Sequence, residues 1–255
     1  MKSQHKTVIL LGITTIAIVA LFFVKRIAQD VTYHAFADGR FFALIPNAMN
    51  VLSNGLMFIV GCIGIYNIYT NKLRLGFSQA NLLFFVAIVC TSIGSAYYHY
   101  NPNNNSLVWD RLPMTIAFMS FFTIVIFQFI SKQVALKLLL PSVLIGISSI
   151  LYWQITRRLG FEDLRFYVLV QFLPLILIVI ITVLYPDNVF KRTTWLILGC
   201  YIIAKLCEQF DTPIFKLIAF SGHSLKHLFA GIAPLIYLYY LRNEKKQKIM
   251  LGLIN

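Results

Sequence analysis

Long apolar windows alternate along the chain with short breaks that are charged or rich in turn-forming residues. Each window holds about 20 residues, enough for a helix to cross about 30 Å of hydrocarbon. No connection between windows is long enough to form a separate soluble domain. The pattern therefore predicts an all-α integral membrane protein with eight helices, at residues 7–24, 48–70, 80–100, 112–130, 135–154, 165–185, 193–208 and 222–241.

The first window has two possible roles. The basic start MKSQHK before an apolar core is typical of a signal peptide, but the core runs to Val24 without a small-x-small cleavage site before Lys25. We therefore interpret the window as a retained anchor helix.

Composition agrees with a membrane protein. Hydrophobic residues make up 59% of the chain and charged residues 12%, well below the roughly 25% charged residues of soluble domains. The net charge is +13, and most Lys and Arg residues lie in short loops and near the C-terminus. Such a distribution is explained by the orientation of membrane helices and does not indicate a nucleic-acid partner. Lys and Arg are modestly enriched on the side that carries both termini, and this bias predicts cytoplasmic termini.

Polar residues collect at the ends of three predicted helices. Ser95 and His99 close one helix, Asp110 opens the next, and His223 and His227 lie in the first turns of the last helix. Alternation of the spans places all five at the membrane face opposite the termini. Both Ser95 with His99 and His223 with His227 are spaced i, i+4, so each pair shares one helical face.

These residue types can form a hydrolytic centre. Three imidazoles can hold a catalytic Zn²⁺ and leave its fourth position to water. Asp110 is a candidate general base and acid, and Ser95 a candidate hydrogen-bond donor to an oxyanion. Each residue also has an ordinary structural role: an interfacial histidine is often a tether, Asp110 suits a helix N-cap, and Ser95 a packing position.

The motifs resemble those of the alkaline ceramidase family, including its bacterial members. The resemblance rests on Ser95-x-x-x-His99, on Asp110 in DRLPM, on His223-x-x-x-His227 in SGHSLKHL, and on IPNAMNVLSN. It implies seven transmembrane helices around a zinc ion held by His99, His223 and His227. It also implies hydrolysis of the amide bond of ceramide-like membrane lipids. Residues 1–29 then form an additional N-terminal anchor helix before a seven-helix domain at 30–255.

The chain departs from eukaryotic members just before the predicted core. Those members build a Ca²⁺ site there from several acidic residues, whereas YHAFADGRFFALIPN contains Asp38 as its sole carboxylate, and Asn47 stands where those members have Glu. Because Ca²⁺ takes six or more oxygen ligands, this stretch does not favour a calcium site. We expect Asp38 and Arg40 to form an ion pair in a lid.

Other functions use similar residues. Seven-helix receptors of the adiponectin type share the Ser, His, Asp and HxxxH elements, and a transporter can relay ions through such a cluster. The five polar residues cluster at one membrane face, and no series of polar residues continues towards the other face. This distribution disfavours a transporter, which needs a polar path across the membrane. A hydrolase of another acyl lipid is the nearest alternative. Near this cluster, we expect Lys205, Glu208 and Asp211 to be structural charge partners inside the bundle rather than contacts to a substrate.

Overall fold

The fold is helical throughout the part of the chain that the structure describes. This computed structural model describes residues 3–70, 73, 76–185 and 188–250, and these residues contain no β-strand. The elements are α1 Ser3–Ala20, the 3₁₀ helix η1 Val31–His34, α2 Ala48–Leu52, α3 Gly55–Tyr69, α4 Ser78–Tyr100, α5 Asn104–Phe129, α6 Lys132–Arg158, α7 Arg165–Leu184, α8 Lys191–Gln209, α9 Asp211–Ile218 and α10 Gly222–Met250. The predicted all-α class is confirmed.

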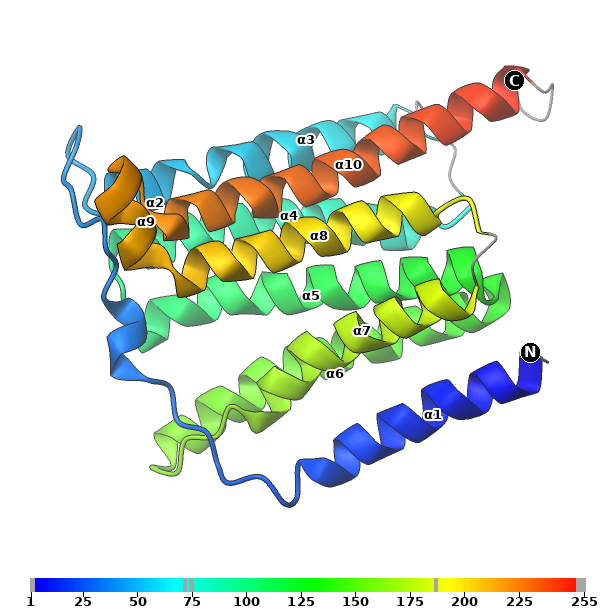
Figure 1. Ribbon diagram of the computed structural model, residues 1–255, viewed down its shortest axis with the longest axis horizontal. Coiled ribbons are helices and arrows are strands. Elements are labelled where there is room, and N and C mark those ends of the chain that lie inside the picture. The colour runs from blue at the N-terminus through cyan, green and yellow to red at the C-terminus, as the bar shows by residue number, and fades with distance from the viewer. Residues whose placement is uncertain (1–2, 71–72, 74–75, 186–187, 251–255) are drawn as a thin grey trace.

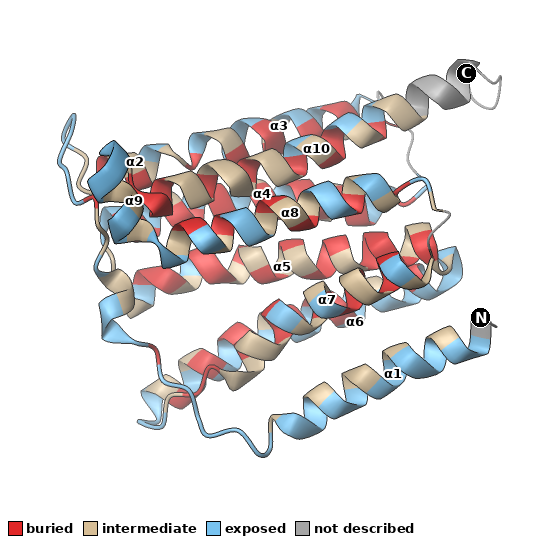
Figure 2. Cartoon of the chain, viewed as in Figure 1, coloured by how far each residue is buried: buried red, intermediate tan, exposed pale blue. Residues whose placement is uncertain are grey.

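The long helices form a bundle (Figure 1). Helix α4 packs between α3 and α5, α10 packs on α3 and α8, and α6 and α7 pack on α5. The start of α1 and the far end of α10 lie at one end, whereas η1, α2 and α9 gather at the other (Figure 1). Helix α1 lies at the edge of the bundle against α7 and is mostly exposed (Figure 2).

Five helical spans in the described part of the chain are long and apolar enough to cross a membrane. They are Ala48–Tyr69, Ser78–Tyr100, Asn104–Phe129, Lys132–Arg158 and Arg165–Leu184. Helices α8 and α10 fall outside this set because both carry ionisable side chains, and α1 is a shorter apolar helix. Large apolar side chains such as Leu140, Leu144 and Leu151 point outwards from α6, as expected for a helix that faces lipid. The number of core spans stays a prediction.

The turn between α4 and α5 corrects one prediction. Helix α5 begins at Asn104 rather than at 112, because Asn103 caps it. The Asn103 side chain accepts hydrogen bonds from the backbone N–H groups of Asn105 and Ser106, and the Ser106 hydroxyl accepts one from the Asn103 N–H. Asp110 therefore lies in the second turn of α5, and its predicted place at the helix start is wrong.

A short helix was also missed. Residues 211–218 form α9, where the sequence pattern predicts only a connection. Its eight residues are too few for an apolar window that spans a membrane. Helix α9 leads directly into α10 and so helps to place the first turns of that helix.

Candidate metal centre

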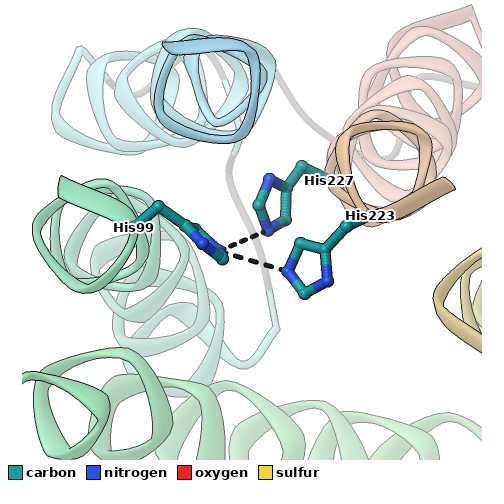
Figure 3. A group of neighbouring side chains, drawn as sticks. All are labelled: His99, His223 and His227. Atoms are coloured by element: carbon teal, nitrogen blue, oxygen red, sulfur yellow. Dashed lines mark hydrogen bonds between the residues drawn. The ribbon is translucent and has the colours of Figure 1, made fainter. Parts of the chain in front are cut away.

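Three histidines from two helices converge at the end of the bundle that holds η1, α2 and α9 (Figure 3). His99 lies in the last turn of α4, and His223 and His227 lie one turn apart at the start of α10. The His99 Nε2 atom is 3.2 Å from Nε2 of His227 and 3.2 Å from Nε2 of His223. All three side chains are buried.

The spacing of these nitrogens suits zinc. Two imidazole nitrogens on one tetrahedral zinc, each 2.0–2.1 Å from the metal, are about 3.3 Å apart. The two separations of 3.2 Å agree with that value. The donor set of neutral imidazoles is also the one that zinc prefers in catalytic sites, where three protein ligands leave a fourth position open.

The remaining ring nitrogen of His227 is oriented by a serine from the turn between α2 and α3. Ser53 Oγ lies 2.8 Å from His227 Nδ1 and donates its own hydrogen to the Asn50 carbonyl oxygen at 3.2 Å. Metal binding through Nε2 requires the proton to be on Nδ1, and Ser53 Oγ is placed to accept a hydrogen bond from it while its own hydrogen is directed to the Asn50 carbonyl oxygen. This leaves the Nε2 lone pair of His227 directed at the other two histidines, as a metal ligand requires.

Backbone contacts hold the two histidine-bearing helices in place. Asn47 donates from Nδ2 to the His99 carbonyl oxygen at 2.9 Å, and the Asp211 carboxylate accepts from the His223 N–H at 2.9 Å. Gly222 begins α10 so close to α8 that a Cβ atom there would lie 2.2 Å from the Cys207 carbonyl oxygen. Close packing at Gly222 therefore fixes the start of α10 and with it the position of His223.

Ser95 and Asp110 lie beside the histidines. Ser95 Oγ is 3.5 Å from His227 Nε2, and its side chain lies within hydrogen-bonding reach of the Asp110 carboxyl group. Both are buried, and both line the same cavity as His227. The structure thus brings together all five polar residues selected from the sequence, although Asp110 reaches the site from inside α5.

Asp38 and Asn47 have separate partners. Arg40 donates to both carboxylate oxygens of Asp38, at 2.8 and 2.7 Å, which confirms the predicted ion pair. The side-chain hydrogen bonds from Arg40 lower the pKa of Asp38 despite its burial. Arg40 also donates to the Ala219 carbonyl oxygen, so it links the segment before α2 to the segment before α10.

Phe36 was not selected from the sequence, yet it covers the histidines. Its ring centroid lies 4.6 Å from that of His99 and 4.8 Å from that of His223. A single aromatic residue in a connecting segment gives no sequence signal for such a role. Ser53 was likewise missed, although its place in the string Asn50-x-x-Ser53-Asn54 was part of the resemblance.

Charged residues next to the histidines form one network. The Glu208 carboxylate accepts from Lys205 Nζ at 2.6 Å, as the predicted pairing requires, and from Lys226 Nζ at 2.7 Å. Lys226 Nζ is also 3.3 Å from His223 Nε2. Asp211, expected in this group, instead bonds to the backbone N–H groups of His223 and Ala37.

A cavity of about 340 Å³ connects these groups with the apolar interior of the bundle. Its polar end includes Ser95, Asp110 and His227, and its remaining wall is mainly apolar, with Phe84, Ile88, Phe118, Phe121, Ile178 and Leu198 among its members. An apolar pocket with a few convergent polar groups is the usual form of a small-molecule site. This one suits an amphiphile whose polar part reaches His227.

Comparison with protein families matches residues 40–249 to the family described as Ceramidase. The match covers both helices that carry the three histidines, together with Ser95 and Asp110. A search of curated proteins found no match for the chain.

Proposed function

The chain belongs to the Ceramidase family, and on that premise we propose that it is a zinc-dependent amidase that hydrolyses ceramide-like N-acyl sphingoid lipids within the membrane. The products are a free fatty acid and a sphingoid base. One observation carries the proposal: three buried imidazoles, with the Nε2 atom of His99 at a zinc-like distance from those of the other two, lie beside Ser95 and Asp110 next to an apolar cavity.

The cavity wall suggests how the substrate is held. Phe118, Ile178 and Leu198 offer an apolar surface for the acyl chain, which leaves the amide at the polar end near the histidines. Because the acyl chain of a membrane lipid is already out of water, the apolar wall holds the chain by van der Waals packing. The cavity therefore orients the amide without a charged contact to the acyl chain.

His99, His223 and His227 would hold the zinc ion. When bound, zinc supplies Lewis acidity and lowers the pKa of a coordinated water towards about 7. Asp110 takes the proton from the attacking water and returns it to the departing amine nitrogen. Ser95 donates a hydrogen bond to the carbonyl oxygen as negative charge develops there.

We also propose a placement in the membrane. Seven segments span the membrane: Ala48–Tyr69, the five helices α4 to α8, and α10. Helix α1 is the additional anchor, within residues 1–29. The termini face the cytoplasm and the histidines lie towards the opposite face. The Lys and Arg bias supports this orientation, as does the position of η1, α2 and α9 opposite the start of α1 (Figure 1).

The test combines metal content with turnover in one preparation. We expect about one zinc per chain by elemental analysis, and release of fatty acid from N-acyl sphingoid lipids in detergent micelles. His99→Ala, His223→Ala and His227→Ala should each lose zinc and turnover, whereas the control His5→Ala, on the exposed face of α1, should keep both. Full turnover in all three variants without zinc would refute the mechanism. Bound zinc without hydrolysis of any N-acyl or ester lipid would favour a receptor.

A further inference from the structure

Besides the proposed reaction centre, the polar end of the cavity carries an unusual number of cations. Arg111, Lys205 and Lys226 line it, together with the carboxyl groups of Asp110 and Glu208. Both lysines donate to Glu208, so this carboxylate is already neutralised within the protein. A neutral ceramide head, with hydroxyl groups alone, gives no reason for this excess of positive charge.

Arg111 is the least satisfied member of this group. It is 6% exposed, and its Nη1 atom is buried without a hydrogen-bond partner among the described residues. The guanidinium carbon lies 5.3, 4.9 and 4.8 Å from the ring centroids of Tyr33, Trp153 and Tyr167. Aromatic faces stabilise the charge but offer no strong acceptor to an N–H group.

Buried donors in proteins almost always have a partner, because an unmade hydrogen bond in a dry site is costly. Tyr33 donates its hydroxyl to Glu208 at 3.3 Å, and its oxygen accepts a hydrogen bond from the Arg111 guanidinium. The Arg111 Nη1 atom still has no partner among the described residues. Since Arg111 lines the cavity, the missing acceptor is best supplied by a ligand inside it.

We propose that this cavity selects N-acyl lipids whose polar head carries an anionic group, such as a carboxylate or a phosphate, bound by Arg111 and assisted by Lys226. The inference rests on the proposed amidase function and specifies its substrate class. Arg111 and Asp110 line the same cavity, so one lipid can contact both residues. Guanidinium is well suited to such an anion because it donates two parallel hydrogen bonds.

The test uses two pairs of lipids that differ in head charge. One pair is N-palmitoyl serine and N-palmitoyl serinol, and the other is N-palmitoyl sphinganine 1-phosphate and N-palmitoyl sphinganine. We expect kcat/KM to favour the anionic member of at least one pair by about tenfold or more, the scale of one charged hydrogen bond. The pair that shows the preference identifies the head group.

Variants then assign the preference to Arg111. Arg111→Gln should reduce the anionic-to-neutral ratio to near one, chiefly through KM of the anionic lipid, and Arg111→Lys should retain part of it. The control Arg158→Gln, at an exposed arginine, should leave the ratio unchanged. A ratio near one in the wild-type protein overturns the inference whether or not the variants fold, and so does an unchanged ratio in folded Arg111→Gln.

The two proposals fail in different ways. Equal hydrolysis of both members of each pair leaves the amidase function standing and removes the head-group preference. If no lipid is hydrolysed, the amidase function fails. Calorimetric titration of the same lipids into the purified protein then still decides whether anionic heads bind about tenfold more tightly than neutral ones.

Discussion

The contact of α4 with α5 at Gly94 gives the sharpest test of the site. A Cβ atom at Gly94 would lie 1.8 Å from the Trp109 carbonyl oxygen and 3.2 Å from the Asp110 backbone nitrogen. Ordinary contact begins at 3.4 Å, so Gly94→Ala forces the two backbones apart by about 1.6 Å. The neighbours of the clash are Ser95 and Asp110, so the displacement falls directly on that pair.

The expected effects on turnover and on stability are comparable in free energy, because a loss of about 100-fold in rate corresponds to about 2.7 kcal/mol. Overpacking of a well-packed contact typically costs about 1–3 kcal/mol, and the cost at Gly94 lies at or above the upper end of this range because the obstructing atoms belong to the backbone. A misplacement of about 1 Å at a reaction centre can cost about 100-fold in rate. We therefore expect Gly94→Ala to lower kcat by about 100-fold or more, with a reduced thermal midpoint in the same detergent.

The control is Gly199→Ala in α8, where a Cβ atom meets nothing within 4 Å. Alanine is the better helix former by about 1 kcal/mol, so this variant should keep turnover and not lose stability. Thermal unfolding, zinc content and fatty-acid release are measured on both proteins. Wild-type turnover in Gly94→Ala would refute the claim that close approach of α4 and α5 positions Ser95 and Asp110.

Three further predictions concern single contacts. Asp110→Asn should keep zinc but lose nearly all turnover; full activity would exclude proton transfer by this group. Ser53→Ala removes the acceptor at His227 Nδ1 and should weaken zinc binding by about 10–100-fold in a competition titration; unchanged affinity would exclude this orienting role. Because hydrogen bonds from Arg40 lower the pKa of Asp38, its carboxylate stabilises the fold at neutral pH and loses this effect as pH falls below 3.8. Asp38→Asn should therefore lower the thermal midpoint at pH 7 and flatten its decline in acid, and a decline as steep as in the wild type would contradict this assignment.

Much of the site could be read from spacing along the chain. An i, i+4 pair lies on one face of any helix, so Ser95 with His99 and His223 with His227 needed no tertiary information. Apolar windows of about 20 residues likewise identify helices, because hydrocarbon leaves the backbone no other way to satisfy its hydrogen bonds. The ends of the helices were predicted less accurately. The Asn103 side chain caps α5 by hydrogen bonds, and a hydropathy pattern contains no information about such bonds.

Hydropathy and spacing in the sequence alone therefore predicted the helical fold, its long apolar spans and the five polar residues that the structure brings together. Tertiary structure alone decided which residues contact these five, because contacts such as Ser53 with His227 and Phe36 with His99 join segments far apart in the chain. It also decided that Arg111 lies in a cavity with an unused donor. Burial and partners depend on how helices pack, and no local pattern encodes that packing.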